Sequence, residues 1–180
     1  MEEIKVAEIK VWDPLVRIFH WTLALACVLN LWLIEDGSDL HEWLGYYAMA
    51  AVLIRIVWGF IGTRYARFSS FFPTPNRLKA HLRAMLQGKA HSLGHNPLGG
   101  LMILGLMTLV LLLGLTGWMM SLDLFWGEDW LEELHKGLAE VLMVLVLVHV
   151  SVVSLYSRFG QDNLIKAMWT GRKSSRLEED

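Results

Sequence analysis

The sequence predicts an all-α integral membrane protein, built as a four-helix bundle with short interfacial helices. Its 180 residues are 54% hydrophobic and 19% charged, with a mean hydropathy of +0.41, which is too apolar for an ordinary soluble domain. The chain also contains four stretches that approach or exceed the ~20 apolar residues that a helix needs to cross a bilayer. We expect helices in all four, because an open strand edge cannot satisfy its hydrogen bonds in lipid.

Hydropathy places the four spans at approximately Ile18–Ile34, Trp43–Gly62, Pro97–Met120 and Leu134–Tyr156. Only Arg55 interrupts the second span, and the third has no charge at all. Lys136 and Glu140 lie in the first turns of the fourth span, at a spacing that allows them to pair. We find no repeat, low-complexity tract or linker, so we expect one domain over residues 1–180.

The loops between the spans differ in charge. The segment from Thr63 to Asn96 has six bases and no acid, whereas Glu35 to Glu42 has four acids and no base. Ser121 to Glu133 has five acids and no base. The positive-inside rule therefore predicts that the basic loop and both termini are cytoplasmic, with the acidic loops on the outer side of a bacterial inner membrane.

Two shorter segments have the pattern of helices that lie on a membrane surface. From Pro75 to Gln87, apolar residues recur at helical spacing with bases opposite them. Asp162 to Trp169 carries apolar residues in a similar way. Both are expected to form amphipathic helices beside the inner leaflet.

Four histidines fall at two depths in this predicted topology. His20 begins the first span and His149 lies deep in the fourth, both toward the cytoplasmic side. His41 and His135 begin the second and fourth spans on the outer side. His135 and His149 are 14 residues apart, so they share one helix face and are separated by ~21 Å along the axis.

This arrangement favours two haem groups, with the axial pairs His20–His149 and His41–His135. A haem iron needs only two axial ligands from the protein, whereas zinc prefers a tetrahedral site with help from Cys or carboxylate. A lone intramembrane histidine is often a hydrogen-bonded packing residue, but polar groups in a membrane usually mark function. Gly45 follows His41 by four residues and would let a flat macrocycle approach, although close helix packing explains it equally well.

Three further residues are candidates for contacts to a haem propionate or to a quinone. Arg55 is 14 residues after His41, on the same face at the opposite depth. A buried cation there needs an anionic partner, unless the side chain extends to the inner interface. Arg17, one turn before His20, could meet a propionate or simply anchor the span. His95 lies at the start of the third span, within reach of a propionate or a quinone.

Several motifs in order resemble the bacterial cytochrome b561 and nickel–iron hydrogenase b-type cytochrome family over nearly the whole chain. They are Val11–Trp21 (VWDPLVRIFHW), His41–Gly45 (HEWLG), Gly62–Phe68 (GTRYARF), Gly94–Gly99 (GHNPLG), and Leu134–Lys136 followed by His149. The resemblance implies a membrane protein with two b haems that moves electrons between a quinone pool and a partner redox protein. Under it, His20, His41, His135 and His149 match the haem ligands.

The family is functionally divided, so several hypotheses stay open. The first is an electron-transfer subunit that serves a c-type cytochrome, a hydrogenase or a similar protein, with no nucleic-acid partner. The second is a stand-alone quinone-reducing oxidoreductase such as a superoxide oxidase. Acidic outer loops disfavour an anionic substrate, because Lys136 is the only nearby base. The third is a transporter that uses membrane histidines for metal ions or protons.

Overall fold

Four long helices form the body of the protein in a computed structural model that describes residues 6–87, 96–160 and 162–176. Each of the four is long and apolar enough to cross a membrane, which confirms the predicted all-α membrane bundle. They are α1 (Pro14–Trp32), α2 (Asp39–Ile61), α5 (Pro97–Met120) and α6 (Asp129–Phe159).

Three of these helices begin at a side-chain cap. The carboxylate of Asp13 accepts the backbone N–H of Val16 at 2.9 Å at the start of α1, and Ser38 and Asn96 cap α2 and α5 in the same way. Proline at the first position of α1 and α5 is already in a helical conformation. Hydropathy placed the starts of α1, α2 and α6 four or five residues too late, because their first turns contain polar and charged residues.

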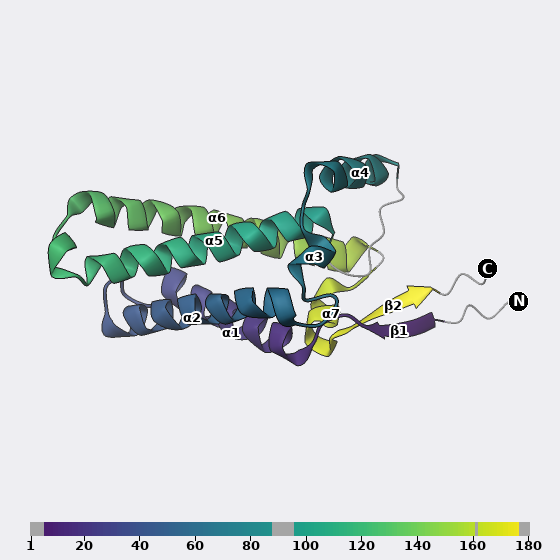
Figure 1. The fold of residues 1–180 in the computed structure, drawn as a ribbon, viewed down its shortest axis with the longest axis horizontal. Helices are drawn as coiled ribbons and strands as arrows, with labels where there is room; N and C mark the ends of the chain where they lie inside the picture. The colour runs from purple at the N-terminus through teal and green to yellow at the C-terminus, as the bar shows by residue number, and fades with distance from the viewer. Residues whose placement is uncertain (1–5, 88–95, 161, 177–180) are drawn as a thin grey trace, which may run out of the picture.

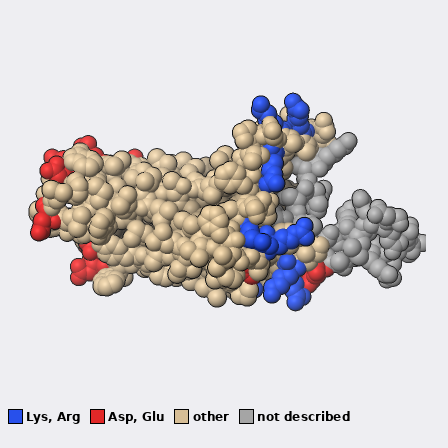
Figure 2. Space-filling model, viewed as in Figure 1, with Lys and Arg blue, Asp and Glu red and all other residues tan. Residues whose placement is uncertain are grey.

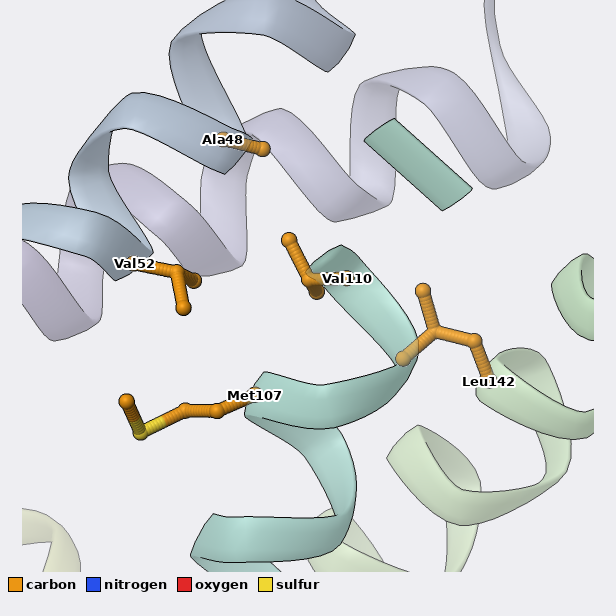
Figure 3. Close-up of a cluster of buried hydrophobic side chains, with 5 residues drawn as sticks. All are labelled: Ala48, Val52, Met107, Val110 and Leu142. Carbon is orange, nitrogen blue, oxygen red and sulfur yellow. The ribbon is translucent and has the colours of Figure 1, made fainter. Parts of the chain in front are cut away.

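The four helices form two layers, with α1 and α2 in one and α5 and α6 in the other (Figure 1). Within the layers α1 packs on α2 and α5 packs on α6, and α2 packs on α5 between them. A buried apolar cluster joins α2, α5 and α6 at mid-height (Figure 3), and it consists of Ala48, Val52, Met107, Val110 and Leu142. Large apolar side chains such as Leu25, Ile54 and Val144 are exposed on the outside of the bundle, as expected for lipid contact.

Charged residues gather at the two ends of the bundle, and the band between them is free of charge on the face shown in Figure 2. The acidic end, at the α1–α2 and α5–α6 connections, exposes Glu35, Asp36, Asp39, Glu42, Asp123, Glu128, Asp129, Glu132 and Glu133. The basic end, at the opposite side, exposes Arg64, Arg67, Arg77, Lys79, Arg83, Arg158, Lys166 and Arg172. This separation of charge matches the loop pattern in the sequence.

Short elements surround the basic end. They are α3 (Phe68–Phe71), α4 (Pro75–Leu86) and α7 (Leu164–Thr170), while a 3-10 turn at Asp123–Phe125 lies at the acidic end. The two short amphipathic segments predicted from the sequence are therefore helical, as α4 and α7. That they lie on a membrane surface stays a prediction.

A two-stranded ribbon at the basic end was not predicted. Strand β1 (Val6–Lys10) lies beside β2 (Arg172–Arg176) in Figure 1. The two strands pair antiparallel, with Lys10 opposite Arg172. Gly171, with φ of +81°, ends α7 in the left-handed region that favours glycine. Its carbonyl accepts the backbone N–H of Val11 at 2.8 Å, which attaches the C-terminal segment beside the start of α1.

Candidate functional site

The first pair of histidines lies in the half of the bundle nearer the basic end. His20 on α1 and His149 on α6 are 129 residues apart in sequence, but their ring centres are 6.3 Å apart. The ring planes are inclined by 55°, and both side chains are half-buried. The two imidazoles therefore face each other from opposite layers of the bundle. We call them the inner pair.

The second pair lies near the acidic end, and we call it the outer pair. The ring centres of His41 on α2 and His135 on α6 are 6.2 Å apart, with planes inclined by 63°. The backbone of His41 is held from two sides: its N–H donates to the hydroxyl of Ser38 at 3.3 Å, and its carbonyl accepts the amide of Asn30 at 3.1 Å. The capped start of α2 thus fixes the height of this imidazole.

His135 has a side-chain partner on the neighbouring helix. Its Nδ1 lies 2.7 Å from the hydroxyl oxygen of Thr116, a residue of α5 that is 5% exposed. The other ring nitrogen of His135 makes no contact with this hydroxyl. Thr116 therefore connects the outer pair to the α5–α6 packing.

An apolar layer separates the two pairs. Leu142 is seven residues from both His135 and His149, so it lies on their face of α6 and halfway between them. Ala48 holds the corresponding place on α2, seven residues after His41. Both belong to the buried cluster of Figure 3. The two levels are thus divided by packed side chains rather than by polar groups.

A buried polar network lies at the inner level. Arg55 is only 2% exposed, and its Nη2 donates to the carbonyl of Ala66 at 2.9 Å while its Nη1 is buried without a hydrogen-bond partner. Asp13 accepts the indole N–H of Trp58 at 3.0 Å and the hydroxyl of Thr63 at 2.6 Å. Burial alone would raise the pKa of Asp13, but these hydrogen bonds, that of Val16 and the charge of Arg55 together hold it below its ordinary value.

Arg17 and His95 are the other two residues predicted to contact a propionate or a quinone. Arg17 is half-buried; its Nη2 donates to the carbonyl of Trp169 on α7, and its Nε is buried without a hydrogen-bond partner. It therefore retains donor capacity within the protein, as Arg55 does. His95 lies outside the described residues.

A model of one protein family covers almost the entire bundle. The family, described as prokaryotic cytochrome b561, matches residues 11–171. The chain belongs to the prokaryotic cytochrome b561 family. No curated protein and no solved structure matched it.

Membership makes this cytochrome a multi-pass protein of the inner membrane that binds b-type haem and takes part in electron transfer. The imidazole pairs can be tested for fit to that group. With metal–nitrogen bonds of about 2.0 Å on either side, two imidazoles that bind one iron have ring centres roughly 6 Å apart. The observed separations of 6.3 and 6.2 Å agree with this requirement.

Two more observations concern the donor set of this cytochrome. The Nδ1 atoms of His20 and His41 are buried without a hydrogen-bond partner in the described part of the chain, so neither ring is held there by another protein group. Among the described residues, no three His, Cys, Asp or Glu side chains gather as a metal site. A haem iron receives four nitrogens from the porphyrin and needs only two from the protein, so the residues present fit haem.

Gly45 is consistent with the same fit in this cytochrome. It lies one turn after His41, and a Cβ placed on it would meet no atom within 4 Å. Helix packing, the alternative reason for a glycine here, is therefore not what the structure shows at this position. The helix surface at Gly45 is therefore open, as a flat group next to His41 would require.

Two residues of the site in this cytochrome were not singled out from the sequence. Asp13 is recognisable afterwards, because Asp before Pro is a helix N-cap signal, but nothing in the sequence indicated its bonds to Trp58 and Thr63. Thr116 is one of two hydroxyl residues in an otherwise apolar span, 19 residues before His135. Whether they meet depends on the length of the α5–α6 connection, which spacing alone does not reveal.

Proposed function

We propose that the protein carries electrons across the membrane through two haem b groups. His20 and His149 would ligate the inner haem, and His41 and His135 the outer haem. The observation that carries the proposal is the presence of two imidazole pairs, each at axial-ligand separation, in one bundle. Because His135 and His149 lie 14 residues apart on α6, the two levels are separated by ~21 Å along the helix.

When bound, each haem supplies a one-electron couple whose potential the surrounding protein adjusts. The four histidines would hold the two haems with one imidazole on each side of each iron, which would leave no open position for oxygen and would favour electron relay. The layer that contains Leu142 keeps water out between the levels. Arg55 and Arg17 place positive charge and free donor atoms at the inner level, where a propionate or a quinone would be held.

The acidic end supports a basic redox partner, such as a c-type cytochrome. Nine exposed acids lie there, and the nearby base Lys136 is already paired with Glu132 at 2.6 Å. Such a field attracts a positively charged protein and increases its rate of association. The same field repels superoxide, so the charge favours an electron-transfer subunit over a superoxide oxidase. A hydrogenase is the other partner class compatible with the family resemblance.

The separation of charge also supports an orientation. Both described ends of the chain, at β1 and β2, lie at the basic end (Figure 1). By the positive-inside rule this end is cytoplasmic, and the acidic end faces outward. Quinone would exchange electrons with a haem edge within the membrane.

Purified full-length protein tests this function. We expect a reduced spectrum of b-type haem, two haems per chain, and reduction of both haems by a quinol followed by oxidation by a small basic c-type cytochrome. A chain that holds fewer than two haems would contradict the proposal. So would a colourless protein that binds zinc, which is the result expected of a transporter, or quinone reduction by superoxide above background.

A further inference from the structure

The hydroxyl of Thr116 is the one side-chain hydrogen-bond partner of an imidazole from the two pairs in the described residues. It lies 2.7 Å from Nδ1 of His135, and it also lies 2.9 Å from the carbonyl oxygen of Leu112 and 3.2 Å from that of Leu113. Thr116 is buried in the membrane part of α5, with 5% of its surface exposed. These three contacts are the hydrogen-bond partners of this hydroxyl among the described residues.

The single proton of the hydroxyl decides the direction of these hydrogen bonds. Carbonyl oxygens can only accept, so the contacts to Leu112 and Leu113 are hydrogen bonds only when the proton of Thr116 is directed to one of them, as is common for threonine within a helix. The hydroxyl oxygen then presents a lone pair to His135. In that arrangement Nδ1 of His135 carries the proton, and Nε2 carries the free lone pair that a metal needs.

We propose that Thr116 is a positioning residue for the outer haem, accepting a hydrogen bond from Nδ1–H of His135 and so presenting Nε2 to the iron. This inference rests on the proposed function, because it assumes that His135 is an axial ligand. Such outer partners orient an imidazole ligand, fix its protonated nitrogen and increase its basicity.

The contrast with the other histidines strengthens the inference. Nδ1 of His20 and Nδ1 of His41 are buried without any partner in the described residues. His41 is therefore held through its backbone, and His135 through its ring. Thr116 also lies where α5 approaches α6 closely, since a Cβ on the next residue, Gly117, would be 3.5 Å from the His135 ring. The hydroxyl is thus held against the imidazole by helix packing.

The consequence is a specific effect on one of the two haems. A hydrogen bond from Nδ1–H makes the imidazole a stronger donor to iron, which stabilises the oxidised state. Removing the acceptor should raise the midpoint potential of the outer haem and leave the inner haem unchanged. It should also weaken haem binding at the outer level by ~10-fold, the lower end of the effect known for such partners.

Thr116→Val tests this in the full-length protein, because valine keeps the shape and removes the hydroxyl. We expect one of the two midpoint potentials to rise, and one haem to be lost ~10-fold more readily to a haem-scavenging protein. Thr116→Ser should restore both values. Thr108→Val is the matched control: Thr108 is two turns earlier on α5, on an apolar surface formed with Phe60, Phe68 and Leu111, and its hydroxyl should be dispensable.

The outcomes separate this inference from the function on which it rests. If wild-type protein holds two haems and Thr116→Val changes neither potential nor haem loss, Thr116 is only a packing residue. If Thr116→Val changes only thermal stability, the inference is equally wrong. Should the valine variant not accumulate, Thr116→Ala must show the potential shift and Thr116→Ser must not. A wild-type chain without two haems overturns the proposed function instead.

Discussion

The carboxylate of Asp13 accepts the indole N–H of Trp58 at 3.0 Å, which ties the residue before α1 to the last turn of α2. The same oxygen accepts the hydroxyl of Thr63, and the other oxygen caps α1 through Val16. One buried carboxylate therefore joins both helices of one layer beside the inner pair. Its removal should disturb the basic end of the bundle as a unit.

Asp13→Asn should destabilise the protein by ~1–3 kcal/mol. Both carboxylate oxygens of Asp13 accept hydrogen bonds, whereas an amide has a single oxygen, so at least one buried N–H group would lose its acceptor. We expect a lower unfolding temperature in detergent, with helices of unchanged content. Thr63→Val removes only one of the three hydrogen bonds and should cost less. Equal stability of Asp13→Asn and wild type would show that the network contributes nothing.

The effect of Asp13 should depend on pH. Its pKa in the folded protein is below the ordinary value of 3.8, so its stabilising contribution is complete above that pH and is lost as the pH falls through the folded value. The stability difference between wild type and Asp13→Asn should thus be constant near neutral pH and shrink at acid pH. A stability difference between wild type and Asp13→Asn that grows as the pH falls would contradict this prediction.

Arg55 should raise the midpoint potential of the inner haem. If the iron were held on the order of 10 Å from Arg55, a unit charge in an effective dielectric constant of ~20 would contribute about 1.7 kcal/mol, or roughly 70 mV for one electron. Arg55→Met should lower one potential by an amount of this order, whereas Arg55→Lys should largely preserve it. Arg64→Met is the control, because Arg64 is an exposed base at the same end of the bundle. Unchanged midpoint potentials in Arg55→Met would show that Arg55 does not raise the potential of the inner haem.

Gly45 should be needed for space beside the outer pair. A Cβ on Gly45 or on Gly137 meets nothing within 4 Å, but Gly45 is one turn after His41 whereas Gly137 is two residues from His135 and faces another direction. Gly45→Leu should reduce the haem content to about one per chain, and Gly137→Leu should leave it at two. Loss of haem in both variants, or in neither, would mean that the glycine does not mark the haem face.

The acidic end should determine how fast a basic partner associates. Asp123→Asn combined with Asp129→Asn should slow oxidation of the reduced protein by a small basic c-type cytochrome and weaken the dependence of this rate on salt. Lys79→Gln combined with Arg83→Gln changes two charges at the basic end and should have no such effect. Identical salt dependence in the acidic variant and wild type would argue against docking at the acidic end.

Hydropathy and charge predicted much of this fold, because both follow from the bilayer itself. The four spans were found from their apolar length, and α5 begins and ends where predicted, at Pro97 and Met120. The start of α6 at Asp129 was not predicted from hydropathy, because the first turns of this helix are polar and lie at the acidic end. The two-stranded ribbon was not predicted either. Its strands β1 and β2 are short, and their pairing joins segments more than 160 residues apart in sequence.

The candidate site was predictable to the level of helix faces. Depth and the 14-residue spacing of His135 and His149 suffice to match the imidazoles in pairs, because helices in a membrane run nearly parallel. Hydrogen bonds between helices, such as that of Thr116, require the rotation and register of each helix. Those depend on packing at residues like Gly114, where a Cβ would be 2.8 Å from the sulfur of Met49.

The haem content of paired histidine variants tests the central claim most directly. We predict that His20→Ala, His149→Ala and the double variant of both each retain one haem per chain, since they affect the same site. His41→Ala and His135→Ala should likewise retain one, and His20→Ala combined with His41→Ala should retain none. A His20→Ala/His149→Ala double variant without haem, or wild-type protein with a single haem, would contradict the two-level account.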